Sequence, residues 1–154
     1  MKFIADAMLG RLCRWLRIMG RDCEFVPHDA RDARLMLLEA RARGTVLLTR
    51  DTSLTAHAGE ARIMLFREQH WRDQLRRLMK ELPLEPDEAG YFTRCTLCNV
   101  PLVEISRGEG LAAAPPSAAE FDYRFTRCPA CGKVYWPGTH LDAVRREIAS
   151  LRTG

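Results

Sequence analysis

Two pairs of cysteines constrain this chain more than any other feature of its sequence. Cys95 and Cys98 form one CxxC pair, Cys128 and Cys131 form the other, and 29 residues separate the two pairs. Four thiolates at this spacing can complete a tetrahedral zinc shell, which leaves no open position for a substrate. We therefore predict a structural zinc ion that holds together a small ribbon of strands.

The residue after each pair supports this interpretation. Asn99 and Gly132 are residue types that tolerate the left-handed backbone of a tight knuckle turn. The alternatives are a chance occurrence of the two pairs and a dithiol redox site. The other two cysteines, Cys13 and Cys23, fall on a helix core face and in a strand, and we expect both to be packed thiols.

The start of the chain predicts a protein that is not exported. Met1 is followed within five residues by Asp6, without the basic stub and apolar region of a secretion signal. No apolar run approaches the roughly 20 residues that a membrane helix requires. We therefore expect no membrane contact and a cytoplasmic location, where thiols stay reduced.

Composition indicates a globular protein with an uneven distribution of charge. The 154 residues are 47% hydrophobic and 29% charged, which favours one ordinary domain or two small ones. The net charge is +4, but residues 1–80 carry 16 basic and 10 acidic side chains, against 8 and 10 in residues 81–154. Most of the basic residues are arginine, which suits bidentate phosphate contacts.

Short apolar runs alternate with helical patterns in the first half of the chain. The runs predict strands at 2–5, 23–26, 46–49 and 63–66, and the helical patterns fall at 9–19, 29–43, 53–58 and 71–82. This order is typical of a parallel α/β sheet, and the third run is apolar enough for a strand buried on both faces. The second helix is expected to pack through Leu35, Leu38 and Ala42.

The rest of the sequence predicts a second, smaller unit. Residues 83–90 form a predicted linker and 112–119 a loop, and a helix closes the chain. We therefore divide the chain into an α/β domain at 1–86 and a zinc ribbon with a C-terminal helix at 91–154.

Three aspartates are placed to meet at one edge of the predicted sheet. Asp6 follows the first strand, Asp32 lies in the step from loop to helix after the second, and Asp51 follows the third. The carboxyl ends of parallel strands share an edge where ligands bind. Clustered carboxylates repel one another unless a cation lies between them, and oxygen ligands suit magnesium or manganese. The alternatives are that Asp32 only complements a helix dipole and that Asp51 is an ordinary turn residue.

The first helix adds positive charge near this edge. It carries Arg11, Arg14, Arg17 and Arg21, all expected to be exposed. Arg11 and Arg14 lie one turn apart, so they can either contact a phosphate backbone or form a solvated helix face. Positive charge beside an acidic metal site is typical of nucleases.

Four segments carry a resemblance to a known family. Residues 3–20, with the sequence FIADAMLGRLCRWLRIMG, resemble the opening of the Mut-seven carboxy-terminal RNase family, a PIN-like nuclease group. The run LLTRD at 47–51 resembles the third-strand motif of that family. CTLCN at 95–99 and CPACGKVYWPGTH at 128–140 resemble its zinc ribbon and closing signature.

The resemblance implies a PIN-like α/β fold with a zinc ribbon and metal-dependent RNase activity. Asp6, Asp32 and Asp51 match the acidic positions of the family, and magnesium or manganese ions bound there would hydrolyse RNA to 5′-phosphate and 3′-hydroxyl ends. PIN domains often carry a fourth acidic residue after the third, where this chain has Thr52 and Ser53. We expect Ser53 to assist through its hydroxyl or a bound water.

Three arginines are candidates for contacts with RNA, and two other functions remain possible for the chain. Arg11 and Arg14 would hold the RNA backbone, and Arg50 is a further candidate. The alternatives are a non-catalytic RNA-binding module and a domain stabilised by structural zinc that binds another protein. A homodimer is compatible with the small sheet and its apolar last helix.

Overall fold

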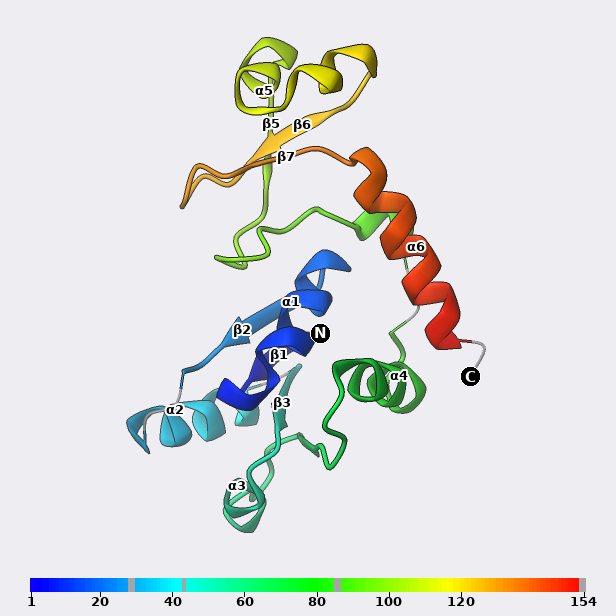
Figure 1. The fold of residues 1–154 in the computed structure, drawn as a ribbon. Helices are drawn as coiled ribbons and strands as arrows, with labels where there is room; N and C mark the ends of the chain where they lie inside the picture. The colour runs from blue at the N-terminus through cyan, green and yellow to red at the C-terminus, as the bar shows by residue number, and fades with distance from the viewer. Residues whose placement is uncertain (28–29, 43, 85–86, 153–154) are drawn as a thin grey trace.

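A four-stranded parallel sheet forms the centre of the first half of the chain (Figure 1). The structure is a computed structural model, and it describes residues 1–27, 30–42, 44–84 and 87–152, with the side chains of residues 30–32 and 139 outside the described part. The strand order is β2-β1-β3-β4. The strands are β1 (Lys2–Ala5), β2 (Asp22–Phe25), β3 (Thr45–Thr49) and β4 (Ile63–Leu65).

Helices connect the strands, as the alternating pattern predicts. They are η1 (Ala7–Leu9), α1 (Gly10–Ile18), α2 (Ala30–Arg41), α3 (Thr52–Ala56) and α4 (Trp71–Glu81). Gly20 lies just beyond α1 with φ 74°, and a Cβ there would lie 2.1 Å from the Gly90 carbonyl oxygen. Only glycine fits this combination of left-handed backbone and close approach.

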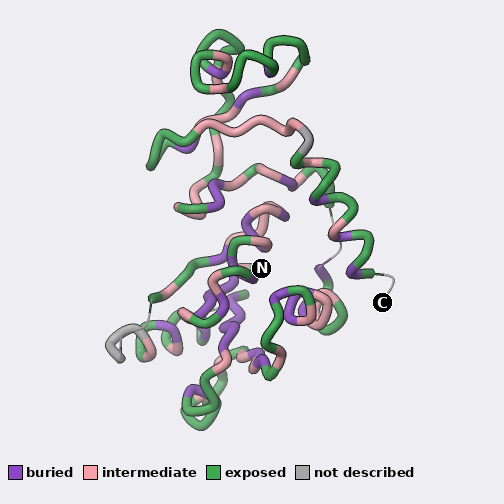
Figure 2. The backbone as a smooth tube through the Cα atoms, in the orientation of Figure 1, coloured by how far each residue is buried: buried purple, intermediate pink, exposed green. Residues whose placement is uncertain are grey.

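Both faces of β3 are buried, as predicted for the third strand, and Figure 2 shows this part of the sheet as buried along its length. Phe3 and Leu48 face one layer, which contains α1 and α4, and Ile4 and Leu47 face the other, which contains α2 and α3. Successive residues of a strand point to opposite faces, so two apolar layers require a strand that is apolar at every position. The layer beside α1 also contains Cys13 and Cys23, which confirms that both are packed thiols. Its other buried members include Leu12, Leu16, Leu75 and Leu78.

The packing face predicted for α2 is wrong. Leu35 and Leu38 are 53% and 61% exposed, whereas Met36 and Ala40 are buried against the sheet. One residue corresponds to about 100° around a helix, so the buried face is displaced from the predicted one. The helix has apolar side chains on most of its circumference, and its periodicity therefore does not select a face.

The second half of the chain forms a three-stranded antiparallel ribbon of strands. Its order is β5-β6-β7, with β5 (Val103–Ile105), β6 (Phe125–Arg127) and β7 (Val134–Tyr135). A short turn of helix, η2 (Glu88–Gly90), precedes it. The loop predicted at 112–119 is wrong, because α5 (Arg107–Ala113) and η3 (Pro116–Glu120) occupy most of it.

A capping box starts α5. The Ser106 hydroxyl accepts a hydrogen bond from the Glu109 backbone N–H, and the Glu109 carboxylate accepts one from the Ser106 N–H. Gly110 then brings the helix against the ribbon, since a Cβ there would lie 2.0 Å from Cγ of Phe125. The reciprocal cap and this close approach give a stable short helix where the alanine and proline content predicts a loop.

The ribbon is joined to the edge strand β2. Arg17 is buried, and its Nε donates to the Cys23 carbonyl at 2.8 Å while its Nη1 donates to the carbonyls of Leu97 at 2.7 Å and Thr96 at 3.2 Å. The Cys23 N–H donates to the Asn99 side-chain oxygen at 3.1 Å. The prediction that Arg17 is exposed is therefore wrong, because its guanidinium satisfies carbonyls on both sides of a buried junction.

The last helix completes the core of the first half. From the ribbon, α6 (Gly138–Arg152) runs to α4, and it buries Val144, Ile148 and Leu151 in the layer beside α1 (Figure 1). The two halves thus share one apolar layer, and the division at 1–86 and 91–154 stays a prediction. In the described residues, no helix is long and apolar enough to cross a membrane.

Candidate functional site

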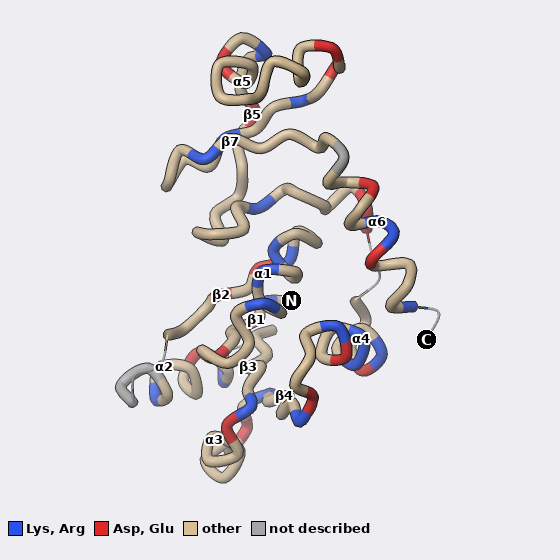
Figure 3. The backbone as a smooth tube through the Cα atoms, viewed as in Figure 1, with Lys and Arg blue, Asp and Glu red and all other residues tan. Residues whose placement is uncertain are grey.

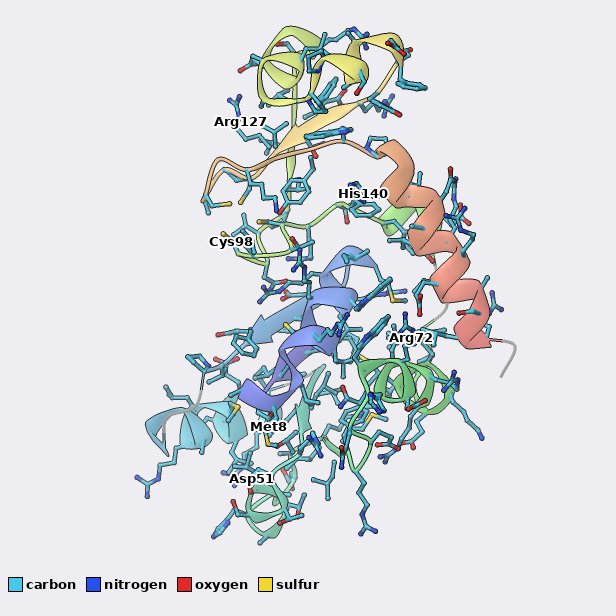
Figure 4. All side chains as sticks on the ribbon, in the orientation of Figure 1. Met8, Asp51, Arg72, Cys98, Arg127 and His140 are labelled. Atoms are coloured by element: carbon cyan, nitrogen blue, oxygen red, sulfur yellow. The ribbon has the colours of Figure 1, made fainter. Side chains whose placement is uncertain are left out.

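A cavity opens at the carboxyl edge of the parallel sheet. Its volume is about 520 Å³, and Asp6, Asp51 and Ser53 line it together with apolar residues of η1 and α2. In Figure 4 the labelled side chains of Met8 and Asp51 mark this part of the molecule, below the sheet. Two of the three predicted aspartates therefore meet at the predicted edge.

Three donors hold the buried carboxylate of Asp6 in place. Its Oδ1 accepts from the Met8 N–H at 2.9 Å and caps η1, and its Oδ2 accepts from the Arg50 N–H at 2.9 Å and from the Thr49 hydroxyl. Asp6 is 6% exposed. These contacts fix the carboxylate at the end of β1, where β3 passes beside it.

Thr49 links the two aspartates, and the sequence reasoning missed it. Its hydroxyl donates to Asp6 and accepts from the Asp51 N–H at 2.9 Å. Asp51 in turn caps α3, with its Oδ1 accepting from the Ser53 N–H at 2.8 Å. The signal available in the sequence was a threonine at the end of a strand whose three central residues are apolar, and the structure buries Thr49 fully.

Asp32 falls in the first turn of α2, but its side chain lies outside the described part of the structure. Ala33, the next residue, lines the cavity of Asp6 and Asp51. The backbone of Asp32 is therefore next to the cavity wall, and its role as a third ligand stays a prediction.

The carboxylate ligands at this edge suit a hard divalent cation. A carboxylate has about four acceptor positions, and protein donors occupy three of those of Asp6. One or two carboxylates suffice for magnesium, which keeps several waters or substrate phosphates as its other ligands. Asp6 and Asp51 thus offer the type of oxygen ligand that such an ion takes, and Asp32 is a further candidate.

The arginines predicted to bind phosphate divide between different surroundings. Basic segments lie along α1 and α4 (Figure 3). Arg11 is exposed, with its guanidinium 5.6 Å from the centre of the Trp71 ring, and Arg14 lines a second cavity beside the ribbon. Arg50 has a buried Nε without a hydrogen-bond partner among the described residues. None of the three lines the aspartate cavity as far as the structure describes it.

The four cysteines converge as the sequence predicts. The Sγ atoms of Cys95, Cys98, Cys128 and Cys131 all lie within 4.8 Å of one another, and those of Cys95 and Cys131 are 3.8 Å apart. A tetrahedron of Zn–S bonds of about 2.3 Å has edges of about 3.8 Å. The cluster is therefore compatible with a structural zinc ion.

The backbone and a tyrosine support this cluster. Asn99 and Gly132 have φ of 64° and 76°, which confirms the predicted left-handed knuckle turns. Burial acts to raise the pKa of the Cys95 thiol, but the hydrogen bond from the Tyr135 hydroxyl and those from backbone amides outweigh it and lower that pKa to about 6. Cys95 is thereby favoured as a thiolate, the form that binds metal.

Together, a parallel sheet with an acidic edge and a ribbon with four clustered cysteines define an α/β protein with a candidate metal site in its ribbon. Residues 1–148 match the Mut7-C RNAse domain, and because this covers nearly the whole chain, the chain belongs to that family. Comparison with curated proteins and with solved structures gave no match. Membership of this family indicates a nuclease or RNA-related function.

Proposed function

We propose that this protein is a metal-dependent endoribonuclease whose reaction centre is the cavity of Asp6 and Asp51. The observation that carries the proposal is the hydrogen-bonded link from Asp6 through Thr49 to Asp51 at the carboxyl edge of the sheet. Ligands of open α/β sheets bind at this edge. Membership of an RNAse family adds the class of reaction.

The residues at this edge would divide the work between holding a cation and orienting RNA. Asp6, Asp51 and Asp32 would bind magnesium or manganese, while Thr49 keeps the first two carboxylates in register. A divalent cation held there would supply positive charge to the attacked phosphate and lower the pKa of a nearby water, and hydrolysis would leave 5′-phosphate and 3′-hydroxyl ends. The Ser53 side chain lies on the same wall and would orient that water.

Positive side chains would hold the RNA outside the cavity. Arg11 and Arg14 project from α1, which starts directly after the helix turn that Asp6 caps. The Arg50 backbone N–H bonds to Asp6, and its Nε has no hydrogen-bond partner among the described residues, so its guanidinium would be a further donor to the RNA. Zinc in the ribbon would have a structural role only, and we propose a cytoplasmic location.

The proposal is tested by RNA cleavage with Asp6→Asn and a matched control. Asparagine can still cap η1 through its side-chain oxygen, but its amide nitrogen cannot accept the hydrogen bonds that reach Oδ2 of Asp6, so the fold of the variant is verified by circular dichroism before cleavage rates are compared. Asp87→Asn makes the same change at an exposed residue that caps η2, far in sequence from the cavity. A labelled single-stranded RNA is incubated with zinc-loaded protein in buffer with added magnesium, manganese or calcium.

We expect Asp6→Asn to lower the cleavage rate by a factor on the order of 100, and Asp87→Asn to leave it unchanged. Equal cleavage by wild type and Asp6→Asn would refute the assignment. RNA binding that persists in every variant without turnover would instead indicate a non-catalytic RNA-binding module. No RNA binding at all would indicate a domain that binds another protein.

A further inference from the structure

A second cavity lies where α1, α6 and the ribbon meet, and the proposed reaction does not use it. Its volume is about 440 Å³, within the range of roughly 300–1,000 Å³ that is usual for small-molecule sites. Its walls carry four aromatic side chains: Trp15, Phe92, Tyr135 and Trp136. Such a concentration of rings is unusual, because the whole chain is only 8% aromatic.

Several of these rings are fixed by contacts behind the cavity wall. Trp15 stacks on Trp71 with ring centres 4.6 Å apart and planes at 9°. The Tyr135 hydroxyl bonds to Cys95 Sγ at 3.2 Å and accepts from the Thr96 N–H at 3.2 Å. Rings held in this way lose little entropy when a flat ligand stacks on them.

Phe92 is held in a rare backbone conformation. Its φ is 55°, in the left-handed region that a phenylalanine seldom adopts, and its N–H donates to the Ile18 carbonyl at 2.9 Å. Strain of this kind persists only where the surrounding structure requires it, and it occurs often at ligand sites. The conformation places Phe92 on the cavity wall.

The charges around this cavity favour an anionic ligand. Arg14, Lys133 and His140 line it, and the Lys133 ammonium lies 5.3 Å from the centre of the Tyr135 ring. The one acidic residue in the described lining is Glu147, and Arg72 pairs with its carboxylate through two hydrogen bonds. In Figure 4 the labelled His140 and Arg72 lie beside α6, toward its two ends.

We infer that this cavity binds unpaired bases of single-stranded RNA, an assignment that rests on the proposed ribonuclease function and names its substrate class. Aromatic rings between basic side chains are the usual means of binding single strands, because every base has a face for stacking and every nucleotide a phosphate. In a duplex the bases are stacked on one another, so their faces are not available. Arg14 is on the same helix as Arg11, one turn away, and the two would carry the strand from this cavity toward Asp6.

Equilibrium binding of RNA tests this inference without cleavage. All proteins are zinc-loaded and carry Asp6→Asn, which prevents turnover, and the probe is a fluorescein-labelled oligouridine of 12 nucleotides. The test variants are Trp136→Ala and, at an exposed position, His140→Ala. The control is Phe121→Ala, which removes a ring that is 50% exposed and stacked on Tyr123 outside the cavity.

Stacking on an aromatic ring contributes about 1–3 kcal/mol per base, so we expect Trp136→Ala to raise the Kd about 5- to 100-fold. Trp136→Phe should recover most of the affinity, because a ring is restored, and Phe121→Ala should bind like the parent protein. His140→Ala should raise the Kd as well. Unlabelled strands are then used as competitors of the labelled probe. An abasic strand of the same length and an RNA duplex should each compete at least 10-fold less well than unlabelled oligouridine.

The result separates this inference from the function on which it rests. Equal affinities for all variants, or equal competition by the abasic strand, would overturn the base-binding site even if the parent chain with Asp6 intact cleaves RNA. If the affinity depends on Trp136 but the parent chain with Asp6 intact does not cleave RNA, the base-binding site is upheld and the nuclease function is refuted. Binding of a peptide in place of RNA at this cavity would also overturn it.

Discussion

Replacing Arg17 by methionine should cost the protein about 2–3 kcal/mol of its free energy of unfolding. The substitution keeps an apolar stem but removes the donors to three carbonyls, those of Cys23, Thr96 and Leu97. A buried acceptor without a donor costs about 1 kcal/mol or more. The Cys23 carbonyl keeps a weaker donor, the Cys13 thiol at 3.4 Å, so the expected total lies slightly below three full losses.

The matched control is Arg14→Met, which makes the same change one turn earlier on the exposed side of α1. Surface substitutions of this kind usually change stability by less than about 0.5 kcal/mol. Both variants are unfolded in urea at saturating zinc, followed by circular dichroism. In a thermal melt, a loss of about 2–3 kcal/mol in the free energy of unfolding should lower the melting temperature of Arg17→Met by about 5–10 °C. A loss for Arg17→Met no larger than that of Arg14→Met would refute the view that Arg17 joins the ribbon to the sheet.

Two further substitutions have outcomes set by the local structure. Gly110→Ala should lower the free energy of unfolding by about 1–3 kcal/mol or more, because its Cβ would overlap Phe125, whereas Gly108→Ala has open space and should be neutral or stabilising in a thermal melt. Cys128→Ser should lose bound zinc, measured by elemental analysis, and unfold at a lower temperature. Cys13→Ser changes a packed thiol and should keep its zinc. Loss of zinc from the Cys13→Ser variant would contradict the assignment of the four cysteines as ligands.

Periodicity and spacing predicted the features that depend on local pattern. The strands of the first half are predicted to within one residue at every end, because each short apolar run is bounded by turn or helix residues. The knuckles follow from the CxxC spacing and from the left-handed residues Asn99 and Gly132. The meeting of Asp6 and Asp51 follows from topology alone, since parallel strands end at the same edge.

The features that the sequence did not reveal depend on contacts between distant residues. Arg17 lies on a helix among exposed arginines, and only the knuckle almost 80 residues later, with its carbonyls at Thr96 and Leu97, makes its burial favourable. The face of α2 could not be chosen because the helix is apolar on several sides. The short helix after Ser106 did have a local signal, a Ser-x-x-Glu capping box, but its two glycines argue against a helix unless Phe125 is known to lie against Gly110.

The position of α1 would give the four-cysteine ribbon a role in the proposed reaction, to which zinc itself would contribute no chemistry. The helix begins after the turn capped by Asp6, its buried Arg17 holds the first knuckle, and its exposed Arg14 lines the ribbon cavity. A packed helix moves as a unit, so a ribbon that unfolds without zinc releases Arg17 and loosens the support of the acidic edge. Loss of zinc should therefore weaken both RNA binding and cleavage, although four thiolates leave zinc no position for a substrate.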